Sequence, residues 1–132
     1  MTNHLKEKNI PTSNGVKREQ HSIDATDKAL GRLATQVAVL LRGKNKVGFA
    51  LHKDIGDFVT MQNIQKLKYT GKKFQNKIYY RHSLYLGGLK KTTMKELSLK
   101  KGHEEIFRKA VMGMLAKNKL RAKQIKRLKF EK

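Results

Sequence analysis

The chain carries far more positive charge than a small protein that folds alone in water usually does. Its 132 residues include 31 Lys and Arg against 10 Asp and Glu, which gives a formal net charge of +21 at pH 7. Like charges at this density repel one another in the compact state. A nucleic-acid backbone relieves that repulsion most effectively, because each neutralised phosphate also releases condensed counterions. The charge therefore predicts a nucleic-acid partner.

Length and composition narrow the class of protein further. The length allows one domain, which buries roughly two-thirds of its unfolded surface. The absence of Cys excludes disulfides and thiolate metal sites, and it suits a reducing compartment. No apolar run approaches the ~20 residues of a membrane span, and the first residues lack the apolar core of a secretory signal. We expect a cytoplasmic protein without cofactor, metal ion, membrane contact or homo-oligomer interface; an organellar location is the alternative.

The chain divides into three parts by composition. Residues 1–20 are polar and hold the single Pro, so we expect a flexible extension. Residues 21–115 are expected to form the folded domain, and residues 116–132 a basic C-terminal extension that is partly helical. From residue 100 onward, twelve basic residues face three acidic ones. A solvated helix face is the ordinary explanation of such a run, but the scarcity of acids for i, i+4 pairing favours a surface that faces phosphates.

The clearest element is a helix over residues 29–42. Its apolar residues recur at i, i+3, i+4 and i+7, and Gly43 stands where a helix C-terminus favours glycine. Thr26 or Asp27 is expected to cap its N-terminus, after a short strand over residues 22–25.

Beyond a loop over residues 44–57, the pattern predicts alternating strands and helices. Glu96 is placed to complete a capping box with Thr93, and Gly102 is expected to separate two helices. Strands are predicted over residues 58–61, 67–70 and 77–81, and helices from 92 or 93 to 99 and over 105–115. This interleaving favours an α/β fold with a mainly parallel sheet.

Two groups of residues raise the question of catalysis. His52, Asp54 and Asp57 lie within six residues, a spacing that could hold Mg²⁺. The competing interpretation is a tight loop whose carboxylates accept local backbone hydrogen bonds, and it is favoured. An RNA-processing enzyme using His52, Asp54 and His82 is a second hypothesis, and a module on anionic membranes is a third. No phosphate-binding loop or nucleophile motif is present, so the sequence does not indicate an enzyme.

A basic and aromatic segment over residues 79–91 is more informative. Tyr79, Tyr80 and Tyr85 alternate with basic residues before the glycine pair at residues 87–88. Tyrosine rings stack on exposed bases, and Lys and Arg contact phosphates. Neighbouring residues of a strand point to opposite faces, so one of Tyr79 and Tyr80 is expected to pack in the core and at most one to face RNA.

Several stretches together resemble the universal large-subunit ribosomal protein family thirteen. They match in order over residues 22–115, and their spacing is specific. The stretches are Asp24-Ala25-Thr26, Leu30-Gly31-Arg32-Leu33-Ala34, Leu41-Arg42-Gly43-Lys44, His52-x-Asp54-x-Gly56-Asp57, Thr70-Gly71-Lys72-Lys73, Tyr79-Tyr80-Arg81-His82-Ser83, Gly87-Gly88-Leu89-Lys90 and Val111-x-Gly113-Met114-Leu115. The chain departs from the family at Ala116, at Leu120-Arg121-Ala122, at Met112 and at Gln20-His21, and its C-terminal extension is short.

The resemblance implies a three-layer α/β/α domain on a four-stranded, mainly parallel sheet. It also implies a non-catalytic protein that binds large-subunit rRNA beside neighbouring ribosomal proteins and supports early assembly, with a structural role for the loop at residues 52–57. The heavy use of Lys and the short C-terminal tail favour a bacterial-type member over an organellar one. By position, the family's implied RNA contacts are Arg42, Lys44, Lys72, Lys73, Arg81, His82 and Lys90. Charge and aromatic character add the candidates Lys46, Tyr80, Lys91, Lys117, Lys119, Arg121 and Lys123.

Overall fold

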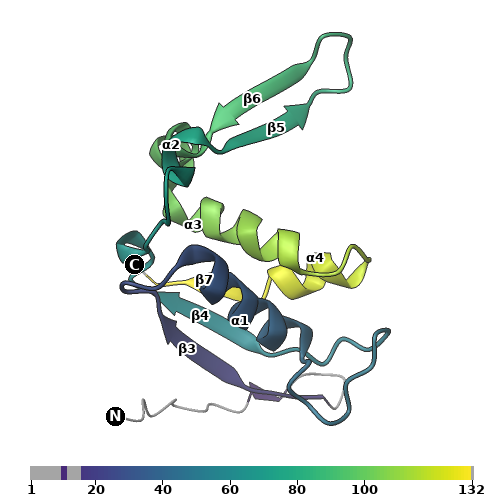
Figure 1. The fold of residues 1–132 in the computed structure, drawn as a ribbon. Coiled ribbons are helices and arrows are strands. Elements are labelled where there is room, and N and C mark those ends of the chain that lie inside the picture. The colour runs from purple at the N-terminus through teal and green to yellow at the C-terminus, as the bar shows by residue number, and fades with distance from the viewer. Residues whose placement is uncertain (1–9, 12–15, 132) are drawn as a thin grey trace.

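A parallel sheet of three strands forms the centre of the molecule (Figure 1). The structure is a computed structural model and describes residues 10–11 and 16–131. The strands are β3 (Gln20–Asp24), β4 (Phe58–Gln62) and β7 (Leu128–Phe130), with β4 in the middle. Val59 of β4 is in register with His21 on one side and with Leu128 on the other. The fold is therefore mixed α/β with a parallel main sheet, as the sequence predicts.

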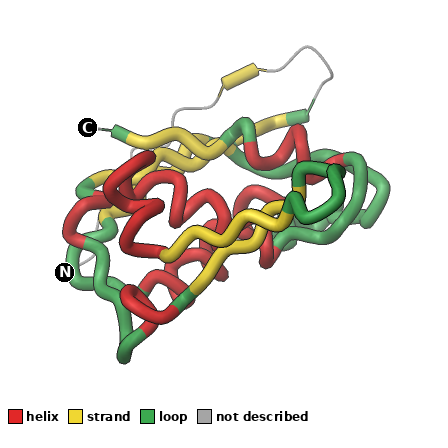
Figure 2. Tube along the Cα trace, turned by 90° about the horizontal axis from the view of Figure 1, so that it is seen from above, coloured by secondary structure: helices red, strands yellow, loops and turns green. Residues whose placement is uncertain are grey.

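Side-chain alternation gives this sheet one apolar and one polar face. Val59 and Met61 are fully buried in the main core cluster with residues of two helices. On the other face, Ser22, Gln62 and Lys129 are exposed. The chain steps in one direction across the sheet, from β3 to β4 to β7, and crossovers of the usual right hand then put their helices on the same face. Among the described residues the domain has two layers, where three were expected (Figure 2).

Helix α1 (Leu30–Arg42) confirms the most regular pattern in the sequence. It buries most of the predicted apolar stripe against β4: Leu33, Ala34, Val37, Ala38 and Leu41. Leu30, the first residue of the predicted stripe, is only partly buried. Gly43 ends the helix at φ 78°, a left-handed conformation that glycine adopts without strain. The predicted N-terminal cap is wrong. Helix α1 follows Ala29 without a side-chain cap, because the backbone N–H and the hydroxyl of Thr26 both donate to Asp24 Oδ1 instead.

Helix α3 (Met94–Met114) contains both of the predicted helices. The Thr93 hydroxyl accepts a hydrogen bond of 3.2 Å from the Glu96 backbone N–H, which confirms Thr93 as the cap. Gly102 is non-helical, at φ 77° and ψ 175°, and breaks the helix where the sequence indicates. The second half buries Ile106, Phe107 and Val111, so α3 packs against α1 over the sheet.

The region between β4 and α3 differs from the expected strands. Residues 67–70 form no strand: a short 3₁₀ helix, η1 (Ile64–Lys66), precedes them, and a single bridge joins Ala29 and Lys68. Helix α2 (Lys73–Asn76) follows. The predicted strand over 77–81 is β5 (Ile78–His82), which pairs antiparallel with β6 (Leu89–Thr93) in a separate hairpin. The described main sheet therefore has three strands rather than four.

Both ends of the chain contribute to the fold where extensions were expected. Helix α4 (Leu120–Ile125) and strand β7 lie within residues 116–132, and Gln124, Arg127 and Leu128 are buried. In the N-terminal part, β1 (Ile10–Pro11) pairs antiparallel with β2 (Lys17–Arg18). The rest of the expected N-terminal extension, residues 1–9 and 12–15, lies outside the described residues, as does residue 132.

Candidate nucleic-acid interface

The sequence from Phe58 to Lys95 contains nine basic residues and not one Asp or Glu. It spans the end of the central strand, the α2 region and the β5–β6 hairpin. Except for Lys95, which precedes Glu96, a basic residue of this segment has no adjacent acidic residue in the chain to neutralise it. None of the ion pairs among the described residues involves this segment. Its positive charge is therefore left for an external partner.

The β5–β6 hairpin extends away from the helices and the main sheet (Figure 1). Tyr80 is opposite Lys91 in its register, and Arg81 is opposite Lys90. All four of these side chains are exposed. Because side chains alternate along a strand, each face of the hairpin carries one of these pairs. The Lys91 ammonium group lies 6.0 Å from the centroid of the Tyr80 ring, so a cation and an aromatic face are presented together.

The two neighbouring tyrosines of β5 have different environments. Tyr79 packs beside the buried cluster of Met94, Leu97 and Ile106, and burial raises the pKa of its hydroxyl. Tyr80 is 62% exposed. The structure thus bears out the expectation that one ring packs and the other faces outward, and it assigns the exposed position to Tyr80.

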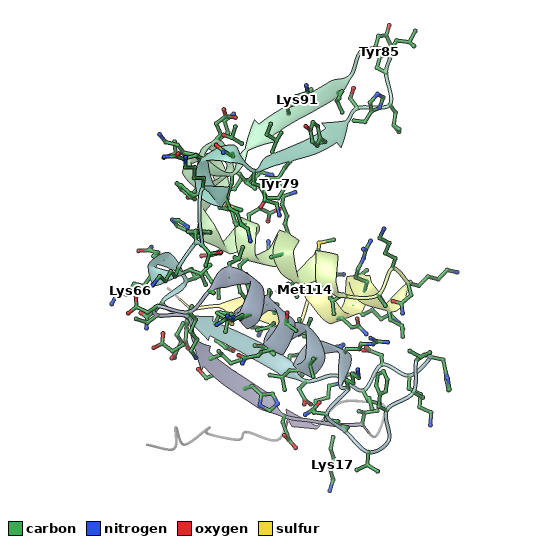
Figure 3. All side chains as sticks on the ribbon, in the orientation of Figure 1. Lys17, Lys66, Tyr79, Tyr85, Lys91 and Met114 are labelled. Atoms are coloured by element: carbon green, nitrogen blue, oxygen red, sulfur yellow. The ribbon has the colours of Figure 1, made fainter. Side chains whose placement is uncertain are left out.

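The turn of the hairpin is an ordered loop with an apolar surface. The Ser83 N–H donates to the Gly88 carbonyl, and the Leu84 N–H donates to His82 Nδ1 at 2.9 Å. A Cβ on Gly88 would stand 2.1 Å from the Ser83 hydroxyl, so only glycine fits there. Side chains at the tip are exposed, and Figure 3 shows Tyr85 at the far end of the hairpin. His82 therefore shapes this loop, in addition to being a predicted RNA contact.

Further basic side chains lie between the hairpin and α1. The predicted contacts Lys72 and Lys73 are exposed at the start of α2. The Lys77 and Lys109 ammonium groups lie 5.6 and 5.7 Å from the centroid of the Tyr79 ring. Sequence reasoning did not single out five basic residues that line the surface here: Lys28, Arg32, Lys68, Lys77 and Lys109. The position of Arg32 off the apolar stripe of its helix was the one available signal.

The remaining predicted contacts lie at the C-terminal end of α1 and in the region of α4. Arg42 places its guanidinium 5.2 Å from the Phe49 ring centroid. Lys44, Lys117, Lys119 and Lys123 are exposed, while Arg121 is half-buried. Helices α1 and α4 are in contact, so these positions approach one another, away from the hairpin (Figure 1).

Asp54, in the loop before β4, is a structural residue. Its carboxylate accepts hydrogen bonds of 2.7 and 2.8 Å from both terminal nitrogens of Arg127, and Arg18 lies 3.6 Å away. Burial by itself would raise the pKa of Asp54, but the hydrogen bonds and charges of Arg127 and Arg18 outweigh it and lower the pKa. The carboxylate therefore stays ionised and joins three distant segments of the chain.

Asp57 is a second anchoring carboxylate and is completely buried. It accepts hydrogen bonds from the Lys46 ammonium group, from the Glu19 N–H at 3.0 Å and from His21 at 3.2 Å. Burial opposes ionisation, but these hydrogen bonds, the one from Lys46 first among them, lower the pKa of Asp57. Lys46 also donates to the Lys17 carbonyl at 2.8 Å. The ammonium group of Lys46, a predicted RNA contact, is thus engaged inside the protein.

The geometry gives little support to metal or catalytic chemistry at these residues. Glu19, His21 and Asp57 bring ligand atoms within 4.8 Å of one another, yet the Lys46 ammonium group already neutralises Asp57. The hypothetical enzyme site of His52, Asp54 and His82 is not assembled. His82 belongs to the hairpin, on the opposite side of the molecule from the loop that holds the other two (Figure 1).

The fold and the charge distribution together define a small, basic α/β protein with an exposed basic hairpin in a segment, residues 58–95, that contains no acidic residue. No helix in the described part of the chain is long and apolar enough to span a membrane. Residues 18–130 match the family described as ribosomal protein L13. The chain belongs to this family, which consists of structural ribosomal proteins rather than enzymes.

The relatives match about nine-tenths of the chain. The chain is 54% identical over 119 residues to the large ribosomal subunit protein uL13 of Kocuria rhizophila, covering 90% of this chain and 80% of the relative. It is 50% identical over 119 residues to the protein of that name from Nitratidesulfovibrio vulgaris strain Hildenborough, covering 90% and 82%. The protein of the same name from Geobacter sp. strain M21 is 49% identical over 115 residues, covering 87% and 80%.

Proposed function

We propose that this chain is a structural component of the large ribosomal subunit that binds large-subunit rRNA mainly through phosphate contacts and supports early subunit assembly. The observation that carries the proposal is the acid-free segment over residues 58–95, whose basic side chains are exposed and form no ion pair with a described residue; three of them, Arg81, Lys90 and Lys91, project on the hairpin. Its relatives are named as large-subunit proteins. The partners would be rRNA and neighbouring large-subunit proteins on a bacterial-type, cytoplasmic ribosome, with one copy of the chain bound.

The predicted contacts have separate roles in this proposal. Arg81, Lys90 and Lys91 contact phosphates along the hairpin, and the exposed Tyr80 ring stacks on an unpaired base. Lys72 and Lys73 contact phosphates near the base of the hairpin. A second contact region is formed by Arg42, Lys44, Lys117, Lys119, Arg121 and Lys123. Lys46 contributes chiefly by holding Asp57.

The test is equilibrium binding of the full-length chain to transcribed large-subunit rRNA over a range of KCl concentrations. The variant R81Q/K90Q/K91Q removes three hairpin charges, and the control K100Q/K101Q/K129Q removes three exposed charges outside the acid-free segment. We expect the hairpin variant to lose at least tenfold in affinity and to have a shallower salt dependence, while the control loses much less.

Assembly is tested by supplying either variant to large-subunit reconstitution and sedimenting the particles. The hairpin variant should be depleted from early assembly particles. Failure of the wild-type chain to bind large-subunit rRNA in preference to a tRNA competitor would contradict the proposal. Equal losses of affinity in the hairpin variant and its control would show that the hairpin is not a specific RNA interface.

A further inference from the structure

Between α1 and the second half of α3, the surface is hollowed and lined by lysines. The hollow has a volume of about 770 Å³, and its basic lining residues are Lys72, Lys73, Lys77 and Lys109. No Asp or Glu lines it. Met114 lies where α3 passes α1, and Tyr79 lies at the base of the hairpin above (Figure 3). We name this hollow the lysine groove.

A second hollow, of about 900 Å³, continues the lysine groove along α1. The two share Gly31, Thr70, Lys73 and Met114 in their linings. The second adds Lys28, Arg32 and Lys68, with Asp27 as its acidic residue. The positive lining therefore follows a path along the surface, as an extended polyanion would require.

The floor of the lysine groove contains two helical glycines that the fold itself does not need. Gly31 is in the first turn of α1 and Gly113 in the last turn of α3. A Cβ built on either residue meets no atom within 4 Å, and neither backbone is left-handed. Glycine lowers the stability of a helix relative to alanine. Its usual benefit in such a position is the close approach of another backbone.

We infer that the lysine groove holds a phosphodiester strand of RNA, whose backbone passes over Gly31 and Gly113 while its phosphates contact the surrounding lysines. The inference rests on the proposed function, because it locates one strand of the same rRNA. Charge complementarity selects this occupant over a protein segment. Four lysines without a carboxylate suit an RNA strand, which carries one negative charge per nucleotide. The Lys77 and Lys109 ammonium groups, both held over Tyr79, are oriented before binding.

The first test uses Gly31→Ala and Gly113→Ala in the full-length chain. We expect the thermal midpoint of each variant to equal or exceed that of the wild type, because the methyl group enters open space on a helix. Affinity for transcribed large-subunit rRNA should fall about fivefold or more for each. Gly48→Ala is the matched control, since its Cβ also meets nothing and it lies outside the groove. Normal affinity for both groove variants would overturn the inference.

The second test exploits the absence of Cys from the chain. Asn76→Cys on the groove lining and Lys100→Cys on the exposed part of α3 each carry a tethered iron chelate that generates hydroxyl radicals. Cleavage of one short rRNA strand from position 76, and not from position 100, is expected in the reconstituted subunit. Absence of rRNA cuts from position 76, with cleavage of a neighbouring ribosomal protein instead, would assign the groove to a protein and overturn the inference.

These outcomes are separable from those of the proposed function. Wild-type chain that fails to bind rRNA contradicts the function itself. If the wild-type chain binds rRNA, the hairpin variant binds it more weakly and the groove variants bind it normally, the proposed function is supported and the lysine groove is excluded as an RNA site.

Discussion

Arg127 and Asp54 form a two-point ion pair between residues 73 positions apart in the chain. The guanidinium also donates to the Leu41 carbonyl at 2.9 Å, near the end of α1. It therefore fastens β7 to the loop before β4 and to a helix at once. The Arg127 side chain is 8% exposed and the Asp54 side chain 18%, so water screens the pair only weakly.

Arg127→Ala should destabilise the protein by about 3 kcal/mol, because it leaves the Asp54 carboxylate partly buried without its main cation. Urea unfolding of the full-length chain measures the loss. Lys129→Ala, at an exposed position of β7 two residues further along the chain, should change stability by less than about 0.5 kcal/mol. Equal losses of stability in the two variants would show that the loss of a positive charge matters, rather than the loss of this particular ion pair.

The two anchoring carboxylates also predict how stability depends on pH. The pKa values of Asp54 and Asp57 are lowered below the ordinary value of 3.8 in the folded chain. A lowered folded-state pKa gives stability that is complete above the unfolded value and is lost as pH falls through the folded one. Unfolding free energy should therefore decline below about pH 4 through these two groups, with a slope that the variant D54N/D57N reduces.

Asp24 is a useful comparison for that experiment. Hydrogen bonds from the Asn63 and Thr26 side chains lower its pKa as well, yet it is exposed on the surface. Asp24→Asn should leave the acid dependence closer to wild type than D54N/D57N does. The opposite order would locate the acid-sensitive contacts in the loop around Asp24.

The elements that the sequence predicted correctly are those fixed by neighbouring residues. Helix α1 follows from its apolar period and from Gly43, and α3 from the Thr93 cap and from the break at Gly102. These signals act within a few residues, so a linear pattern contains them. The different environments of Tyr79 and Tyr80 likewise follow from strand alternation alone.

The elements that sequence reasoning missed depend on distant partners. Strand β7 has only three residues within a basic run, and its register with Val59 to Met61 becomes visible only in the folded chain. Lys46 looked like any other loop lysine, but the chain brings it to Asp57. Conversely, residues 67–70 have a strand-like composition, yet they form only a single bridge, between Lys68 and Ala29 just before α1, so no ladder of strand pairs forms.

Gly56 is predicted to be irreplaceable for packing. A Cβ on this residue would stand 1.8 Å from the Leu41 carbonyl oxygen and 2.5 Å from the Leu41 carbonyl carbon, both of them backbone atoms of α1. Gly56→Ala should cost at least about 2 kcal/mol, because the loop must shift away from α1. Gly48→Ala, in the same loop but facing open space, is the matched control and should be nearly neutral. Thermal unfolding of both variants decides the point.

The paired tyrosines predict a separation of binding from stability. Tyr80→Ala should cost about 1–3 kcal/mol of rRNA affinity if its ring stacks on a base, with little change in unfolding. Tyr79→Ala should cost about 2 kcal/mol of stability, because its ring packs on the Met94 cluster. Binding titrations and thermal unfolding of both variants are the measurements. A Tyr80→Ala variant with wild-type affinity would show that this exposed ring does not stack on a base.

Replacing a lysine that has an ion-pair partner within the protein should lower stability, whereas replacing an exposed, unpaired lysine should lower RNA binding. Lys72 and Lys73 are exposed and form no ion pair with a described residue. Lys72→Ala or Lys73→Ala should therefore lower the slope of log affinity against log salt by about one contact each, without changing sequence preference or stability. Lys46→Ala should instead cost about 2 kcal/mol of stability, since Asp57 is buried and loses its ammonium partner.

Two measurements distinguish the exposed lysines from Lys46: the slope of log rRNA affinity against log salt concentration, and a urea unfolding curve for each variant. Below the unfolding transition, Lys46→Ala should bind with a slope close to that of the wild type, because its ammonium group is occupied by Asp57 in the free protein. A slope reduced by a full contact in Lys46→Ala would mean that Lys46 leaves Asp57 when RNA binds. The loop before β4 would then rearrange on the ribosome rather than stay as the free chain holds it.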